Sequence, residues 1–171
     1  GTVALDTFYH AVNKVEPSFI RVEADEVTYN LHIMVRFELE MALLTGALKV
    51  ADLPIAWNKK YQDYLGITPP DDALGVLQDI HWSAGLFGYF PTYSMGNLLS
   101  VQLYEAARAA HPTIPTEIAA GKFDTLRGWM AEHLYRHGRK FEPKELIQRA
   151  TGEAMNARAY VAYLKDKYSA I

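Results

Sequence analysis

Apolar residues recur along most of the chain at the three- and four-residue spacing of an amphipathic helix. Residues 23–44 show this spacing best, and it resumes after each break in the pattern. The apolar face of this segment contains Val27, Leu31, Met34, Val35, Leu39, Ala42 and Leu43. Further helices are predicted over residues 53–65, 71–82, 92–110, 123–137, 143–150 and 152–168, with a shorter helical stretch at Thr116.

Glycine and proline residues mark where these helices end. Gly66 follows the last periodic residue of one helix, and Pro69-Pro70 interrupts the connection to the next. Residues 83–91 hold two glycines and a proline, which predicts a loop or a sharp bend. Only residues 18–22 alternate like a strand, and nothing nearby would pair with them. The pattern therefore predicts an all-α protein.

Composition narrows the class of protein. The 171 residues are enough for one domain with a core, and a chain that is 50% hydrophobic and 22% charged is typical of soluble globular proteins. A net charge of -3, with Lys and Arg scattered, gives no sign of nucleic-acid binding. No apolar run reaches the roughly 18 residues that would span a membrane. We expect one helical domain over residues 1–171, with no nucleic-acid or membrane partner.

The chain has no cysteine and no initiator methionine. The first absence excludes disulfides and thiolate metal sites, and it is compatible with a reducing compartment, so we expect a cytoplasmic location. Gly1 opens directly into a helix-like segment without the basic and apolar regions of a signal peptide. Such a beginning is expected for a piece of a longer protein.

The most unusual segment, residues 75–93, gathers polar and aromatic side chains. On a helix, Gln78, His81 and Trp82 would share a face, with Asp79 about 100° away from Gln78. An amide, an imidazole and an indole are costly to bury unless each finds a partner. A structural hydrogen-bonded cluster and a ligand site both explain them, and the residues alone favour the structural cluster. The glycines between this cluster and the tyrosines at 89 and 93 allow close approach of a ligand.

Arg21 lies between two apolar residues, just before a helix whose first turn is acidic. Glu23 and Glu26 fit the helix dipole and need no other role. Arg21 is expected to be partly buried and paired with Asp25, and a guanidinium in such a place is also suited to binding a carboxylate. The local sequence supports the structural and the binding role of Arg21 equally.

No complete catalytic apparatus is visible in these residues. His133 and His137 have the spacing of a two-histidine metal site, but Leu134 stands where a zincin has its glutamate, so a solvated helix face is favoured. Glu-x-x-His pairs of a ferritin-like metal protein, a nucleophile elbow and phosphate-binding loops are also absent. No metal ligand is therefore assigned in this chain.

Two motifs make the chain resemble the carboxypeptidase Taq family of zinc metallocarboxypeptidases. The family's IRxxAD matches Ile20, Arg21, Ala24 and Asp25, and its GxxQDxHW matches Gly75, Gln78, Asp79, His81 and Trp82. The stretches LPIAWN (53–58) and ELIQRATGE (145–153) extend the resemblance over nearly the whole chain. The family's HExxH helix, its glutamate zinc ligand and its DxRxT motif lie upstream of IRxxAD and have no counterpart here. The resemblance implies the C-terminal portion of a larger, zincin-like helical metallopeptidase.

The resemblance also implies roles for individual residues. In the parent enzyme, zinc or another divalent metal would drive removal of C-terminal residues from peptides with broad specificity, and this chain alone would bind no metal and be inactive. Arg21 would bind the substrate's terminal carboxylate, with Gln78 and Asp79 orienting the site. His81, with Tyr89 or Tyr93, would contact the oxyanion or leaving group.

Family members are typically dimers, so a homodimer is also expected. The alternative is a helical interaction or dimerisation module that has kept the fold and lost the chemistry.

Overall fold

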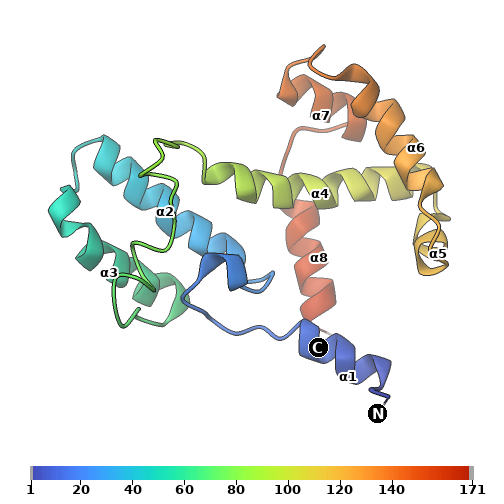
Figure 1. Cartoon of the computed structure of the whole chain (residues 1–171). Coiled ribbons are helices and arrows are strands. Elements are labelled where there is room, and N and C mark those ends of the chain that lie inside the picture. Colours follow the sequence, from blue (N-terminus) through green and yellow to red (C-terminus); the bar gives the residue numbers. More distant parts are fainter. Residues whose placement is uncertain (1, 170–171) are drawn as a thin grey trace. The chain divides into compact units, whose positions relative to one another are not determined.

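Helices account for the regular structure of residues 2–169, the part of the chain that the computed structural model describes, and this part contains no strand. The all-α prediction is confirmed. The chain forms two compact units, residues 1–94 and residues 95–171 (Figure 1). The prediction of a single domain over residues 1–171 stays a prediction. None of the described helices is long and apolar enough to cross a membrane.

The first unit is built on α2 (Tyr29–Leu44) and α3 (Leu53–Leu65), which pack side by side (Figure 1). Proline in the first turn of α3 needs no hydrogen-bond partner, and Gly66 ends the helix in the left-handed conformation. The bounds of α3 are those that the sequence predicts. The core between the two helices consists of Val35, Leu39, Leu53, Trp57, Tyr61 and Leu65. The remaining elements of this unit are α1 (Leu5–Val12), the 3-10 turns Arg21–Glu23 and Val50–Asp52, and the start of α4 (Pro91–Ala110).

The helix predicted from residue 23 begins only at Tyr29. Before it, the Asp25 carboxylate accepts hydrogen bonds from the backbone N–H groups of Val27 and Thr28 and from the Thr28 hydroxyl. A short acidic side chain that satisfies these donors stabilises a turn instead of a further helical turn. Asp25 is therefore occupied locally, and the prediction that it pairs with Arg21 is wrong.

The helix predicted over residues 71–82 is also wrong, because this segment is a series of turns. A Cβ on Gly75 would lie 3.1 Å from the Asp71 carbonyl oxygen, so a larger residue there would require this turn to shift by a few tenths of an ångström. The Gln78 side-chain amide donates to the carbonyls of Leu74 and Gly75. In a helix, the Leu74 carbonyl would instead accept the backbone N–H of Gln78. Gln78, His81 and Trp82 consequently do not share a helix face.

The second unit contains most of α4, together with α5 (Ile114–Ala119), α6 (Asp124–His133), α7 (Pro143–Thr151) and α8 (Arg158–Tyr168). Its core consists of Ala107, Ile114 and Trp129. The helix predicted over residues 123–137 breaks at Leu134, where the backbone leaves the helical region, and a 3-10 turn follows. His133 and His137 are thus not on one α-helical face. His133 packs instead on the Trp129 ring, with 4.6 Å between ring centroids.

Candidate functional site

A buried carboxylate shared by two arginines lies at the centre of the first unit. Asp79 accepts from Arg21 Nε and Nη2 at 3.2 and 2.7 Å through one oxygen, and from Arg36 Nε at 2.6 Å through the other. Arg36, on α2, is 0% exposed and Arg21 is 6% exposed. Two guanidinium groups thus face one carboxylate, and the trio carries a formal excess of one positive charge.

The protonation states of this trio follow from its contacts. Burial alone would raise the pKa of Asp79, but the hydrogen bonds and charges of Arg21 and Arg36 outweigh it and hold that pKa below its ordinary value. Burial lowers the pKa of Arg21, whereas Asp79 and Tyr29 together raise it above its ordinary value. Both groups are therefore ionised across the physiological range.

Gln78 joins the same network through both ends of its amide. Its Oε1 accepts from the Arg21 backbone N–H at 2.9 Å and from Arg36 Nη2 at 2.7 Å. Its Nε2 donates to the Phe19 carbonyl at 2.9 Å. Gln78 consequently fixes the main chain on both sides of Ile20, so Arg21 is held by its backbone as well as by its side chain.

His81 and Tyr93 form a pair next to Arg21. His81 Nε2 lies 3.0 Å from the Tyr93 hydroxyl, and the Arg21 guanidinium carbon lies 5.0 Å from the centre of the Tyr93 ring. His81 Nδ1 is buried without a hydrogen bond and is 3.7 Å from Asp79 Oδ1. Burial lowers the pKa of His81, and the nearby arginines add to this against the opposing effect of Asp79. A neutral imidazole is therefore favoured.

The structure brings together the residues that the sequence singled out. Tyr89 joins the group through its ring, which lies 5.7 Å from the His81 ring and 5.5 Å from the Tyr93 ring, and it is 44% exposed. The other members are connected to one another by hydrogen bonds or ion contacts. They are Arg21, Gln78, Asp79, His81 and Tyr93.

Sequence reasoning missed the residues of α2 and α3 that support this group. Arg36 could have been noticed in the sequence. It lies three positions before Leu39 and seven before Leu43, so it falls on the apolar face that these residues form. A charged residue in the middle of an apolar face needs a buried partner. The partner itself, Asp79, is 43 residues away and could not be named from that signal.

His32 and Tyr61 extend the buried network further into the core. His32 Nδ1 lies 3.1 Å from the Tyr61 hydroxyl, and that hydroxyl donates to the Phe19 carbonyl at 3.1 Å. Burial lowers the pKa of His32 to about 4, with a further contribution from the charges of Arg36 and Arg21. His32 is thus neutral at physiological pH and serves the packing of the cluster.

The arrangement suits the binding of an anion beside a neutral donor pair. A guanidinium has five N–H donors, and the contacts of Arg21 with Asp79 and Tyr29 use three of them. These residues do not form a site for the zinc or other divalent metal that the family resemblance implies. Within residues 2–169, no three His, Cys, Asp or Glu side chains come close enough together to hold a metal ion.

Known proteins with similar sequences are carboxypeptidases. The chain is 52% identical over 171 residues to thermostable carboxypeptidase 1 of Thermus thermophilus, covering 100% of this chain and 34% of that protein. It is 47% identical over 167 residues to carboxypeptidase 1 of Bacillus subtilis, covering 98% and 33%. The chain thus spans about a third of the length of the curated relatives that it matches.

Solved structures agree with the sequence comparison. The M32 carboxypeptidase from Deinococcus radiodurans matches with a TM-score of 0.95 and 48% identity, over 98% of this chain and 34% of that chain. Trypanosoma cruzi metallocarboxypeptidase 1 matches with a TM-score of 0.91 and 35% identity, over 96% and 35%. The sequence model of the carboxypeptidase Taq (M32) metallopeptidases matches residues 1–168. The chain therefore belongs to the carboxypeptidase Taq (M32) family of metallopeptidases.

Proposed function

We propose that this chain is the substrate-side portion of a longer metallocarboxypeptidase, the parent enzyme, which removes C-terminal residues from peptides with broad specificity. Its relatives carry the names of carboxypeptidases, and the chain corresponds to about a third of their length. The observation that carries the proposal is the cluster of Arg21, Asp79, His81 and Tyr93, in which a fixed cation adjoins a neutral imidazole–phenol pair.

Arg21 is the group proposed to bind the terminal carboxylate of the peptide. Its unused N–H donors can donate to a second carboxylate in addition to Asp79. The positive charge of Arg36 behind Asp79 leaves the trio with the net charge that an anionic substrate requires. Gln78 and Asp79 orient the guanidinium and contact no substrate themselves.

His81 and Tyr93, with Tyr89 beside them, are proposed to contact the oxyanion or the leaving amine. A neutral imidazole and a phenol have one donor each, and the hydrogen bond between His81 and Tyr93 uses one of the two. The remaining donor can stabilise charge that develops in the transition state. The exposure of Tyr89 gives this end of the cluster access to a substrate. Because His81 and Tyr93 already bond each other, they form one preformed unit.

The zinc or other divalent metal that the family implies would polarise the scissile carbonyl and activate a water molecule when bound. The described residues of this chain do not fit it, since they form no three-ligand group. We therefore derive no step through the metal from these residues. The ligands and the general base belong to the remaining part of the parent enzyme.

The chain alone is expected to bind zinc weakly and to release no amino acid from a peptide. Tight binding needs about three preassembled protein ligands, which residues 2–169 do not bring together. Isothermal titration with zinc and a peptidase assay at saturating zinc measure both properties, with the parent enzyme as the positive control. A stoichiometric site of micromolar or tighter affinity, or turnover by the chain alone, would contradict the proposal.

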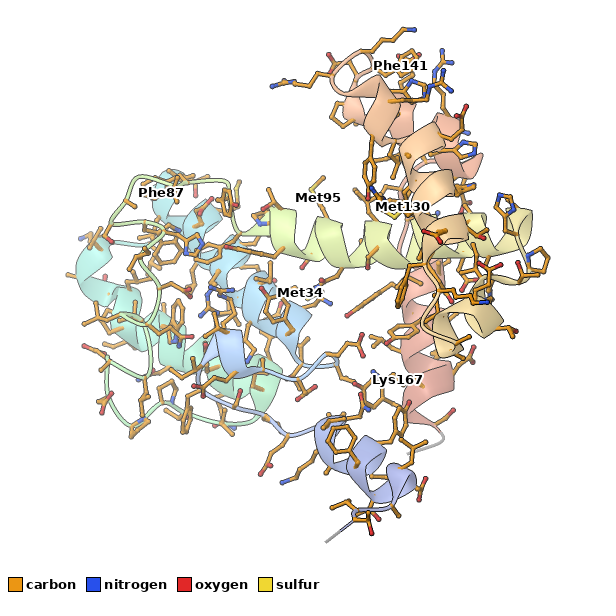
Figure 2. All side chains as sticks on the ribbon, turned by 45° about the vertical axis from the view of Figure 1, so that its right-hand side comes forward. Met34, Phe87, Met95, Met130, Phe141 and Lys167 are labelled. Atoms are coloured by element: carbon orange, nitrogen blue, oxygen red, sulfur yellow. The ribbon has the colours of Figure 1, made fainter. Side chains whose placement is uncertain are left out.

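Association with a second copy is the proposed quaternary state, and it also belongs to the alternative function of a non-catalytic interaction module. An exposed apolar stripe runs along α2, from which Met34 projects in Figure 2. Its residues recur at helical spacing, so they form one continuous face. They are Met34, Phe37, Met41 and Leu44. A cytoplasmic location stays a prediction.

Self-association of the chain should rise with concentration and depend on the α2 stripe. The double substitution Phe37→Glu with Met41→Glu places two charges on this face and should shift the chain to a monomer. Light scattering across a wide concentration range measures the change. Ile55→Glu on α3, which replaces a still more exposed apolar side chain outside the stripe, is the control and should leave association unchanged. A strictly monomeric unsubstituted chain would refute this prediction.

A further inference from the structure

Glu40 is a buried carboxylate that bonds two separate points of the segment carrying the proposed donor pair. It lies on α2 and is 3% exposed. Its Oε2 accepts from the Trp82 indole N–H at 2.7 Å, and its Oε1 accepts from the backbone N–H of Gly88 at 2.6 Å. Hydrogen bonds to an ionised acceptor are about twice as strong as neutral ones. Glu40 therefore ties both ends of the stretch 82–88 to α2.

The bend between these two points has little packing of its own. Gly85 and Gly88 adopt φ values of +74° and +79°, a region that favours glycine. The two residues between them, Leu86 and Phe87, are 44% and 50% exposed, and Phe87 lies on the outer part of the bend in Figure 2. Such a segment depends on specific bonds for its position, and the bond at Gly88 immediately precedes Tyr89.

The bend is also held by backbone hydrogen bonds from Leu86 to His81 and from Gly85 to Trp82. Phe90, just after it, is 1% exposed and packs on both His81 and Trp82. Glu40 and Phe90 thus hold neighbouring points of the chain, Glu40 by hydrogen bonds and Phe90 by burial. Tyr89 lies between them, and Tyr93 follows one helical turn after Phe90 at the start of α4. A shift of Gly88 would move Tyr89 first and then change how His81 meets Tyr93.

We infer that Glu40 is a positioning residue of the parent enzyme, which sets the geometry of His81, Tyr89 and Tyr93 through Trp82 and Gly88. This inference rests on the proposed function of the donor pair. Glu40 touches neither substrate nor metal in this assignment, and it acts only through the bend. Substituting Glu40 should therefore slow the catalytic step and leave binding of the terminal carboxylate unchanged.

Arg36, one turn earlier on α2, provides the contrast that makes the inference specific. Besides the His32 carbonyl and the Tyr61 hydroxyl, it donates to Asp79 and Gln78, which in turn hold Arg21. Disturbing Arg36 should weaken carboxylate binding and raise KM, whereas disturbing Glu40 should lower kcat. Two buried side chains of α2 thus support different parts of the site. Arg36 supports Arg21, and Glu40 supports the donor pair.

The test is a substitution series at Glu40 in the parent enzyme. Gln keeps the size and one acceptor oxygen, while Met keeps the approximate size and removes both acceptors. We expect kcat to fall about tenfold with Gln and further with Met, with KM changed by less than about threefold. Glu38→Gln, on the same helix but partly exposed and bonded to Lys60 and Tyr64, is the matched control and should change neither constant.

Hydrogen exchange of the peptide covering residues 83–92 supplies a readout that does not depend on activity. Exchange should be about tenfold faster with Glu40→Gln and unchanged with Glu38→Gln, with circular dichroism and metal content as checks on folding. A variant series in which exchange and kcat stay at the unsubstituted values overturns the inference. If the Met variant does not fold, the isosteric Gln variant decides.

Tyr93→Phe separates failure of the inference from failure of the proposed function. A loss of kcat in Tyr93→Phe without one in Glu40→Gln overturns the positioning role alone. No loss in Tyr93→Phe overturns the proposed role of the donor pair, and the inference falls with it. Loss of kcat in both, with KM nearly unchanged for Glu40→Gln, supports the inference.

Discussion

Replacing Asp79 with asparagine should destabilise the chain by about 3–5 kcal/mol, the range found when one partner of a buried ion pair is removed. The change leaves the guanidinium groups of Arg21 and Arg36 facing each other without the carboxylate that both bind. Asparagine has nearly the same shape, so the loss reports charge rather than a cavity. Urea denaturation followed by circular dichroism gives the difference in free energy of unfolding.

The control for this prediction is Asp63→Asn, which removes an exposed partner of Lys59 and should cost less than about 1 kcal/mol. Adding Arg36→Met to Asp79→Asn should cost less than the sum of the single changes, because one unpaired cation is removed. Additive losses, or an equal loss at both aspartates, would show that the shared ion pair is not what stabilises this region.

The pH dependence of stability gives an independent check on Asp79. Its pKa is lower in the folded chain than in the unfolded chain, where it is about 3.9. The unfolded state therefore takes up the proton first as the pH falls. The contribution of Asp79 is complete above that unfolded value and disappears as the pH falls through the folded value. Asp79→Asn removes this contribution, so its stability should fall less steeply than that of the unsubstituted chain below about pH 4.

The sequence predicts correctly those helices whose ends are set by residues at the ends themselves, such as a proline in the first turn or a glycine after the last. The helix from Leu53 to Leu65 is an example, because a proline in its first turn and Gly66 after its last residue act locally. Residues 71–82 were predicted wrongly for the opposite reason. There the Gln78 side chain is held by Arg21 and Arg36, which are 57 and 42 residues away. Its amide also donates to the Leu74 carbonyl, which in a helix would accept the backbone N–H of Gln78.

The site was predictable as a set of residue types but not as a set of contacts. Arg21 and Asp79 were each identified from the sequence, yet Arg21 was assigned to Asp25, its neighbour in the chain. The observed partner is Asp79, 58 residues away. Arg36 and Glu40 were not singled out from the sequence, although both are buried in the fold. The carboxylate partner of Arg36 and the indole partner of Glu40 could not be named from the sequence, because each lies more than 40 residues away.

Removing Arg21 should lower kcat/KM of the parent enzyme roughly 100-fold, which corresponds to about 3 kcal/mol for the loss of a charge-assisted pair of hydrogen bonds. Arg21→Ala removes the group proposed to bind the terminal carboxylate, so most of the loss should be in KM. Bound zinc should be unchanged, because Arg21 is no metal ligand. Steady-state kinetics with a short peptide and metal analysis of the same samples measure both effects.

The Arg21 prediction becomes specific when the substrate is varied together with the protein. A peptide whose C-terminus is an amide lacks the negative charge, so the unsubstituted enzyme should discriminate against it strongly. Arg21→Ala should lose most of that discrimination, because the two changes remove opposite ends of the same contact. Arg108→Ala, which removes an exposed guanidinium paired with Glu105 on α4, should keep it in full. If Arg21→Ala lowers activity equally on both peptides, Arg21 supports the fold through Asp79 and does not bind the substrate.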